Sequence, residues 1–349
     1  MSHLEANNSP DNSLRCHYSQ QSLTELLASD RVLAVIGHGA DCQPAADARH
    51  YPSGLVPLSD ADSYEVWSTS SPVCSGTDQK TRWSRSEELL FAARWVDDGS
   101  AADQAEAIYN AYSDLLGFIE HSGYPHIARI WNYMPDINEG KADSERYRRF
   151  CLGRKRAFEQ SSYRRNSYPS ACALGHDGKQ TLIYMLARKE PTRHIENPRQ
   201  QSAYEYPREY GPASPLFARA SLVDWLRGSQ LFVSGTASIV GHESRFPDNL
   251  DGQLQTTFDN IDILLQRAAS EIGAVEIPKM SILKVYIRRP EDYEAVRAAI
   301  GQRFGGVAAH YVRADICREE LLVEIDGVAD LSDIPQASSL PNTKALIGE

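Results

Sequence analysis

Residues 102–188 and 253–326 carry the same order of predicted elements, and few folds accommodate such a repetition. Apolar residues recur every three to four positions in the predicted helices and alternate in the predicted strands. The first copy predicts helix, strand, helix, strand and strand over residues 102–122, 127–134, 143–160, 170–174 and 181–188. The second copy predicts the same order over residues 253–272, 280–288, 291–303, 308–313 and 321–326.

This repetition predicts an α+β protein of two structurally related domains and disfavours one doubly wound sheet. The copies share no evident residue identity, so two unrelated α+β pieces remain the alternative. The turn-rich first hundred residues predict one strand over 32–36 and a loop over 67–80. A further strand is predicted over 231–240, before the second copy.

A connector, residues 191–219, separates the two copies. Its five prolines disfavour a regular element, yet its composition is not that of a flexible linker. It carries Tyr204, Tyr206, Tyr210, Arg199, Arg208 and Arg219. An ordered loop of this kind either walls a binding site or straps two domains together, and the sequence leaves both open. The predicted division is 1–190, the connector, and 220–349.

Charge and termini limit the partners of the chain. Among 349 residues, 36 Lys and Arg are outnumbered by 47 Asp and Glu, which gives a formal net charge of −11. Counterion release therefore offers little affinity for nucleic acid. No stretch approaches the roughly 18 apolar residues that cross a bilayer, and the amino end does not resemble a secretory signal. We expect a cytoplasmic protein without nucleic-acid or membrane partners.

Metal-binding and cofactor motifs are missing from the sequence. The six cysteines form no C-x-x-C pair, so neither a disulfide framework nor a zinc site is expected. His242-Glu243 does not continue into H-E-x-x-H, and Gly37-His38-Gly39 lacks the later glycine of a dinucleotide loop. We therefore expect no metal and no cofactor.

The predicted helix over 143–160 places one arginine on an apolar face. Helical spacing groups Arg154 with Tyr147, Cys151 and Phe158, which directs the guanidinium inward. A buried guanidinium must meet a carboxylate, either from the protein or from an anionic ligand. The alternative is a solvated surface residue, as expected for most of the arginines around it, and Gly153 weakens the predicted helix on which the face assignment depends.

Glu324 lies in the predicted strand LLVEID, on the face opposite Val323 and Ile325. If that face is covered, burial raises the pKa of the carboxyl and prepares it to donate a proton near neutral pH. If it is open, Glu324 is an ordinary surface carboxylate. Cys317, shortly before this strand, is either a small buried residue or a reactive thiol.

Several long motifs resemble known proteins. Four segments resemble the YjgF/RidA-like (chorismate mutase-like) fold, namely SGTASIVGHES (234–244), QTTFDNIDILL (255–265), ILKVYIR (282–288) and LLVEIDGVA (321–329). Three others, with the tyrosine-rich connector, resemble the chorismatase family, a two-domain elaboration of that fold: RIWNYMPDIN (129–138), ERYRRFCLGRKRAF (145–158) and YVRADICREELLVEIDG (311–327). The resemblance implies two related domains, each a mixed sheet packed against helices, the first of them degenerate.

The resemblance implies an enzyme that cleaves chorismate to pyruvate and a ring product without a cofactor. It places Glu324 as the acid that protonates the enolpyruvyl ether and Cys317 beside the ring. Arg154 and Arg219 then hold the two carboxylates, and Tyr133, Tyr206 and Tyr210 form the walls. Cys317 favours 3-hydroxybenzoate as product, whereas Ala237 stands where part of that branch has glycine, so 3- and 4-hydroxybenzoate together are also expected.

Three other functions remain open at this point. A chorismate hydrolase of the same family adds water and gives a dihydroxycyclohexadiene carboxylate with pyruvate. A RidA-like enamine or imine deaminase is disfavoured, because Ala309 stands where such proteins carry an arginine. A non-catalytic binder of small ligands would use the same arginine-lined cleft. YjgF/RidA-like folds commonly form trimers, so the chain is expected to be a monomer or a homotrimer.

Overall fold

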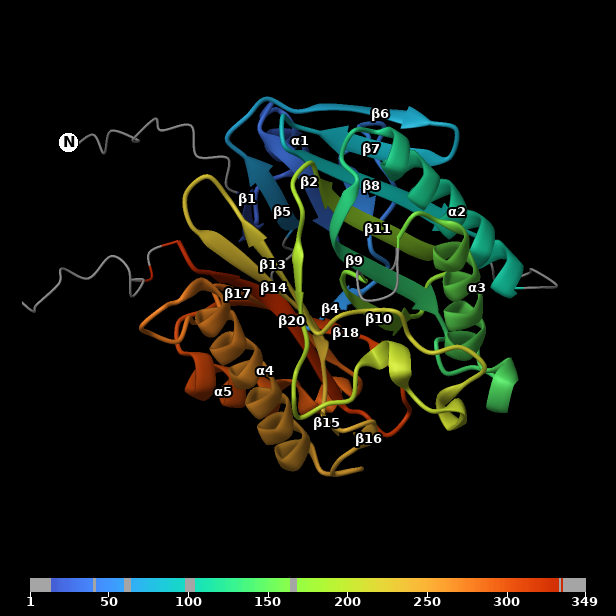
Figure 1. Cartoon of the computed structure of the whole chain (residues 1–349), viewed down its shortest axis with the longest axis vertical. Helices are drawn as coiled ribbons and strands as arrows, with labels where there is room; N and C mark the ends of the chain where they lie inside the picture. The colour runs from blue at the N-terminus through green and yellow to red at the C-terminus, as the bar shows by residue number, and fades with distance from the viewer. Residues whose placement is uncertain are drawn as a thin grey trace, which may run out of the picture.

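The computed structural model describes residues 14–39, 42–59, 64–97, 104–163, 168–332 and 334. Two seven-stranded sheets dominate the described residues, and their strands follow one order (Figure 1). The first sheet has the order β19-β10-β9-β11-β8-β7-β6. Its strands are β19 (Asp315–Ile316), β10 (Ser170–His176), β9 (His126–Pro135), β11 (Thr181–Arg188), β8 (Leu89–Val96), β7 (Thr81–Arg85) and β6 (Cys74–Asp78).

The second sheet has the order β4-β18-β17-β20-β14-β13-β12, which repeats the first sheet strand for strand. Its strands are β4 (Val56–Pro57), β18 (Ala308–Arg313), β17 (Ile282–Ile287), β20 (Val323–Asp330), β14 (Ser229–Thr236), β13 (Ala220–Asp224) and β12 (Arg193–Ile195). In each sheet one central pair is parallel, β9 with β10 and β17 with β18. The neighbouring pairs, β9 with β11 and β17 with β20, are antiparallel. The expected fold of two related α+β domains with mixed sheets is therefore confirmed.

Each copy completes its sheet with a short strand from the other part of the chain. β19 comes from the second copy and pairs with β10 of the first sheet. β4 comes from the first sixty residues and pairs with β18 of the second sheet. β12 belongs to the connector but pairs with β13. The division at residues 190 and 220 stays a prediction, and these pairings tie the predicted parts together.

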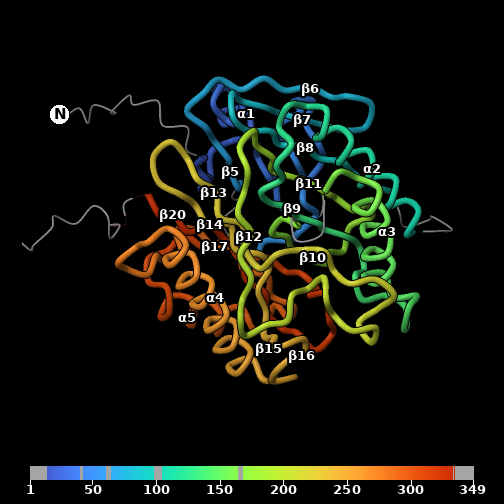
Figure 2. Tube along the Cα trace, viewed as in Figure 1, coloured from blue at the N-terminus to red at the C-terminus, as the bar shows by residue number. Residues whose placement is uncertain are grey.

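Two helices cover the outer face of each sheet (Figures 1 and 2). Helices α2 (Gln104–His121) and α3 (Arg146–Gln160) pack on the first sheet, and α4 (Leu250–Ile272) and α5 (Tyr293–Phe304) pack on the second. Gly153 does not interrupt α3, because it lies where α3 meets α2, and a Cβ there would stand 2.3 Å from the carbonyl oxygen of Ala105. Asn249 caps α4 by accepting from the amide of Gly252.

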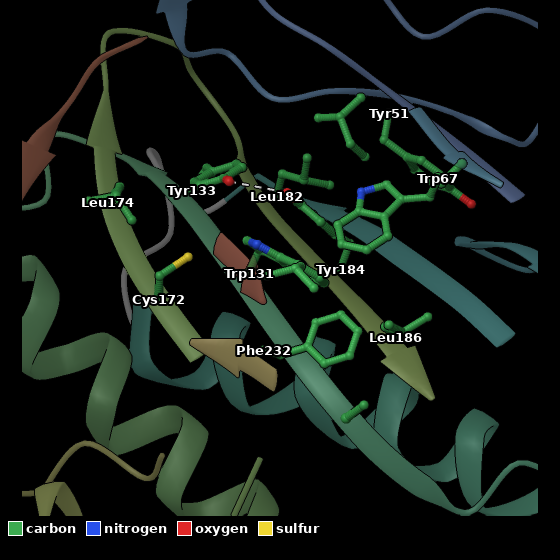
Figure 3. Packing of buried hydrophobic residues seen from close by; sticks show 14 of the residues in the cluster. Tyr51, Trp67, Trp131, Tyr133, Cys172, Leu174, Leu182, Tyr184, Leu186 and Phe232 are labelled. Atoms are coloured by element: carbon green, nitrogen blue, oxygen red, sulfur yellow. Dashed lines mark hydrogen bonds between the residues drawn. The ribbon is translucent and has the colours of Figure 1, made fainter. Parts of the chain in front are cut away.

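The inner faces of both sheets meet in a central core (Figure 3). Trp131 and Tyr184 of the first sheet stack at 4.8 Å between ring centroids, and Phe232 approaches from the second sheet. A third wall comes from a four-stranded sheet in the order β1-β5-β2-β3, which contributes Trp67 to this core. Its strands are β1 (Leu14–Ser19), β5 (Tyr64–Thr69), β2 (Val32–Gly37) and β3 (His50–Pro52), with the short helix α1 (Leu23–Leu27) beside them.

The predicted elements agree with the structure in the two copies but not in most of the first hundred residues. Every helix and strand predicted in the two copies is present, with ends moved by a few residues. The strand predicted over 32–36 is β2, but it is one of eight strands described before residue 97. The loop predicted over 67–80 is wrong in part, because Cys74–Asp78 forms β6 in a hairpin with β7.

The connector is ordered along its length and runs between the two halves (Figure 2). After β12 it contains two 3₁₀ turns, Ala203–Glu205 and Arg208–Tyr210. A further 3₁₀ turn, Ala142–Ser144, precedes α3, and Pro290–Asp292 precedes α5. The two-stranded hairpin β15 (Ile239–Val240) and β16 (Glu243–Ser244) follows β14. These segments surround the cavity described next. In the described part of the chain, no helix is long and apolar enough to cross a membrane.

Candidate active site

A cavity of about 490 Å³ lies between the two domains, beside the carboxyl end of the connector. Strands β10, β14 and β20 form its floor, helix α3 forms one side, and the connector and residues 317–320 close the other. Seven of the eight predicted site residues line it: Glu324, Cys317, Arg154, Tyr206, Tyr210, Arg219 and Ala237. A volume of this size suits a small organic ligand.

Glu324 points into this cavity from the covered face of β20. Val323 and Ile325 pack against α4 and α5, so strand alternation turns Glu324 toward the interior between the sheets. Glu324 is only 4% exposed. Of the two alternatives, a covered face and an open one, the structure therefore shows the covered face. Burial, followed by the charge of Asp326, raises the pKa of Glu324 to about 8, although Arg129 and Arg219 act in the opposite direction. The carboxyl is therefore largely protonated at neutral pH.

Gly235 on β14 leaves the space that the Glu324 carboxyl occupies. A Cβ at residue 235 would stand 1.8 Å from Oε1 of Glu324 and 2.9 Å from the Cβ of Cys172. A side chain there would displace the carboxyl, since Cβ of Cys172 closes the space on another side. Glycine within a strand is typical of such a close approach. The steric role of Gly235 was not predicted from the sequence.

Arg154 carries an unpaired guanidinium into the cavity. The residue is 3% exposed, and its Nε and Nη2 atoms are buried without a hydrogen-bond partner among the described residues. The guanidinium lies over the rings of Tyr112 and Phe158, with 5.5 Å to each centroid. These aromatic contacts hold it in place but do not replace the hydrogen bonds that a buried cation requires. The inward direction predicted from helical spacing is thus correct.

Arg219, the residue before β13, supplies a second buried guanidinium. Its Nη2 donates to the carbonyl oxygen of Gln201 and to the hydroxyl of Tyr206, both at 2.8 Å. Its Nε is buried and has no partner among the described residues. Phe217 supports the guanidinium from one side at 5.1 Å. Arg219 is therefore fixed on one edge and has hydrogen-bonding capacity left for a ligand.

Arg318 ties the rim of the cavity together. Its guanidinium lies 4.0 Å from the ring centroid of Tyr210 and 5.4 Å from that of Tyr206. Its Nη1 donates to the carbonyl oxygen of His242 and to the hydroxyl of Ser244, in the hairpin after β14. The connector therefore walls the site, as one of the two alternatives expected. Sequence analysis missed Arg318, although it follows Cys317 directly.

Two cysteines stand next to Glu324 in the cavity wall. Burial raises the pKa of both the Cys317 and the Cys172 thiol, and the nearby charge of Glu324 raises each further. Neither thiol is therefore prepared to act as a thiolate nucleophile. Ala237 faces the same space, and its carbonyl oxygen accepts from Nδ2 of Asn260 at 3.1 Å. These three residues shape the floor of the cavity.

Tyr133 lies away from the cavity, so the structure does not support the wall position expected for it. Along β9 it alternates with residues that face α2 and α3, and it points into the central core instead (Figure 3). Its hydroxyl lies 3.0 Å from that of Tyr286 and accepts from Nζ of Lys284 at 3.1 Å. Tyr184 donates to it as well, at 3.1 Å. The motif that carries Tyr133 gave no information on which face of the strand meets the cavity.

The described residues contain no group of three or more His, Cys, Asp and Glu side chains that would hold a metal ion. What the cavity does bring together is two guanidiniums with free hydrogen-bonding positions, aromatic walls and one neutral carboxyl. This arrangement is able to bind a small dianion and to protonate it.

Comparisons with known proteins agree with this arrangement. Residues 65–187 match the family described as Chorismatase FkbO/Hyg5-like, N-terminal. A chorismatase of Streptomyces hygroscopicus is 34% identical over 324 residues, which cover 90% of this chain and 93% of the relative. A 3-hydroxybenzoate synthase of the same organism is 35% identical over 311 residues, covering 85% of this chain and 91% of the relative.

A solved structure is similar to this chain over nearly the whole length of both. The crystal structure of a chorismatase superposes with a TM-score of 0.83 at 31% identity, covering 91% of this chain and 99% of that chain. The likeness therefore includes both domains and the connector that walls the cavity. By sequence and by structure, this chain belongs to the chorismatase family of enzymes.

Proposed function

We propose that this enzyme cleaves chorismate to pyruvate and a hydroxybenzoate. The observation that carries the proposal is the buried Glu324, whose pKa is raised to about 8, in the wall of a cavity that is also lined by Arg154 with its unpartnered buried nitrogens. Chorismate offers two carboxylates for the arginines, a ring for the aromatic walls and an acid-labile enol ether for the proton donor. The names of the relatives, chorismatase and 3-hydroxybenzoate synthase, support the same chemistry.

The first step is proton transfer from the Glu324 carboxyl to the methylene carbon of the enolpyruvyl group. The π electrons of that group form the new C–H bond, and the ether oxygen shares the positive charge as an oxocarbenium ion. Glu324 becomes a carboxylate, which stabilises the cation across a dry cavity. General acid catalysis of this kind contributes about 10² to 10⁴ in rate.

The second step releases pyruvate from the ring. The neighbouring ring hydroxyl attacks the ring carbon that carries the ether oxygen and gives an epoxide. The bond between that ring carbon and the ether oxygen breaks, and its electrons neutralise the oxocarbenium ion to give pyruvate. The Glu324 carboxylate accepts the hydroxyl proton and regains its starting form. The epoxide then opens, its oxygen takes up a proton, the ring carbon loses one, and the hydroxybenzoate forms. Chorismate thus divides into pyruvate and hydroxybenzoate without added water.

Arg154 and Arg219 are proposed to hold the two carboxylates, because both line the cavity and retain buried nitrogens without a partner among the described residues. Tyr206 and Tyr210 are the proposed walls, fixed by Arg219 and Arg318. Cys317 is proposed to contact the ring as a neutral thiol. Since Cys317 and Ala237 together shape the floor, we expect 3-hydroxybenzoate, with 4-hydroxybenzoate as a second product.

Incubation of the enzyme with chorismate, followed by chromatography of the ring product, tests this proposal. Hydroxybenzoate and pyruvate in equal amounts are expected. A dihydroxycyclohexadiene carboxylate would show that water is added, and absence of any pyruvate would favour a binding protein. Ammonia released from an enamine, with chorismate unchanged, would favour a deaminase. A cytoplasmic location stays a prediction, as does the choice between monomer and homotrimer.

A further inference from the structure

Two ion pairs lie buried between the sheets, behind the cavity and outside its wall. Nη2 of Arg129 contacts Oδ2 of Asp326 at 2.7 Å, with side chains 1% and 4% exposed. Lys284 pairs with Glu65 of the small sheet in equally dry surroundings. A buried ion pair is weak evidence for stability, because desolvation of both charges offsets their attraction. The mechanism above gives neither pair a role.

The first pair stands directly behind Glu324. Glu324 and Asp326 are two residues apart on β20 and therefore share its inner face. Tyr286, on the neighbouring strand opposite Glu324, donates to Oδ2 of Asp326 at 2.9 Å. Sγ of Cys172 lies 3.9 Å from that hydroxyl and also lines the cavity. Asp326 is thus separated from the cavity by one layer of side chains.

The two carboxyl groups have opposite surroundings. Asp326 accepts from Arg129 and Tyr286, the donors that a carboxylate needs in a dry environment. Glu324 has no hydrogen bond or ion pair with the described residues and lies in the empty volume above Gly235. Neighbouring carboxyl groups with such different surroundings are typical of acid–base sites.

The groups that face Glu324 come from every element packed against it. β20 contributes Asp326, β9 contributes Arg129, and the residue before β13 is Arg219. The thiols of Cys172 and Cys317 and the hydroxyl of Tyr286 lie nearby, and β14 offers Gly235. Across the same cavity, α3 contributes Arg154, and the segment before β20 contributes Arg318, Glu319 and Glu320. Asp326 acts more strongly on the pKa of Glu324 than Arg129 does, and in the opposite direction.

We propose that Asp326 and Arg129 are positioning residues of the reaction, because the buried pair places a compensated carboxylate behind Glu324 and keeps the acid loaded with its proton. This inference rests on the proposed role of Glu324 as proton donor. Asp326 opposes a second negative charge on the same strand face. Arg129 neutralises Asp326, so that the carboxylate is tolerated in the core, and its own attraction for the Glu324 carboxylate is weaker than the repulsion from Asp326.

The pH dependence of kcat/KM with chorismate tests this role, since kcat/KM reports the free enzyme. Wild-type kcat/KM is expected to fall as pH rises and Glu324 loses its proton. In Asp326→Asn the uncompensated Arg129 attracts the deprotonated form, so this fall moves to lower pH by about 1 unit or more. In Arg129→Met the uncompensated Asp326 repels the deprotonated form of Glu324, so the decrease in kcat/KM moves to higher pH. Opposite shifts from two partners of one ion pair do not follow from a merely structural role.

Two further variants preserve the test if a single charge removal prevents folding, as is common for buried pairs. Arg129→Lys keeps both charges and should leave the position of the fall unchanged. The double variant Arg129→Met with Asp326→Asn removes both charges. Because Asp326 has the stronger effect, the fall in the double variant should move to lower pH, by less than in Asp326→Asn alone. Thermal unfolding of each variant establishes that it is folded.

The outcomes separate this inference from the proposed function. Shifts in the same direction in both single variants, or a double variant whose fall stays at the wild-type pH, would overturn the positioning role while leaving Glu324 as the acid. Full turnover in Glu324→Gln would instead remove the acid itself, and the proposed function would fail first.

Discussion

The Glu324 carboxyl fills the space that a side chain on Gly235 would need: a Cβ on residue 235 would stand 1.8 Å from Oε1 of the glutamate. The two residues lie on neighbouring strands, β14 and β20, where the register shifts between Val233 and Thr236. The bulge at this shift and the missing side chain together open the pocket that Glu324 fills. The position of the proposed acid therefore depends on a residue that carries no chemistry.

Gly235→Ala is expected to displace the Glu324 carboxyl and to lower kcat for pyruvate release by about a hundredfold or more, since general acid catalysis is lost. Steady-state kinetics with chorismate measures this. Gly301→Ala is the control, because residue 301 lies in α5 with open space around it, and alanine there should raise stability by about 0.5–1 kcal/mol. A Gly235→Ala variant with wild-type kcat would contradict the steric account.

Arg154→Met is expected to weaken chorismate binding without weakening the fold. The guanidinium leaves buried nitrogens unpaired in the free enzyme, so its removal relieves a desolvation cost. Loss of charge-assisted hydrogen bonds to a carboxylate, about 1.5–3 kcal/mol, should raise the Kd for chorismate roughly tenfold or more. Calorimetric titration and thermal unfolding measure the two effects.

Arg156→Met serves as the matched control on the same helix. Its side chain is 39% exposed and pairs with Glu106 outside the cavity. Affinity for chorismate should stay at the wild-type value in this variant. If Arg154→Met binds chorismate as tightly as Arg156→Met does, Arg154 is not a carboxylate ligand.

Glu324 should make stability depend on pH. Its pKa is raised from 4.5 to about 8, so the folded protein binds this proton more tightly than the unfolded chain does. The resulting stabilisation is fully present below about pH 4.5 and is lost as pH rises through about 8. The free energy of unfolding of the wild type, relative to Glu324→Gln, should therefore decrease over this interval. Urea unfolding at several pH values measures it, and parallel curves would refute the raised pKa.

Cys317→Ala is expected to change the ring product more than the rate of pyruvate release. The thiol stands beside Glu324 and is held neutral by burial, so it contributes volume and not a nucleophile. Alanine leaves space for water next to the ring, and we expect the dihydroxycyclohexadiene carboxylate to appear at the expense of hydroxybenzoate. Chromatography of the products gives the ratio. Cys74→Ala, at an exposed thiol, should keep the wild-type ratio.

Local periodicity was sufficient to find the parts of the site that lie on regular elements. Strand alternation separates Glu324 from Val323 and Ile325, and helical spacing places Arg154 with its apolar neighbours. Tyr133 was expected in the wall from the family resemblance alone, and periodicity could not correct that expectation, because β9 is buried on both faces and its pattern does not say which face meets the cavity.

Contacts between distant segments were beyond the reach of the sequence. Arg129 and Asp326 are separated by 197 residues, and neither position indicates its partner. Short strands were missed for another reason: β3 of the small sheet and β4 of the second seven-stranded sheet span only three and two residues, too short to show alternation. In β6 nearly every residue is exposed, so the strand has no apolar face to reveal it.

The central claim is that Glu324 delivers the proton that starts cleavage, and pyruvate release by Glu324→Gln tests it most directly. The glutamine retains the shape of the side chain and has no acidic proton. We expect chorismate affinity to stay within a few-fold of the wild type and turnover to fall by at least about a hundredfold. Turnover at the wild-type rate in a variant that binds chorismate normally would contradict the account.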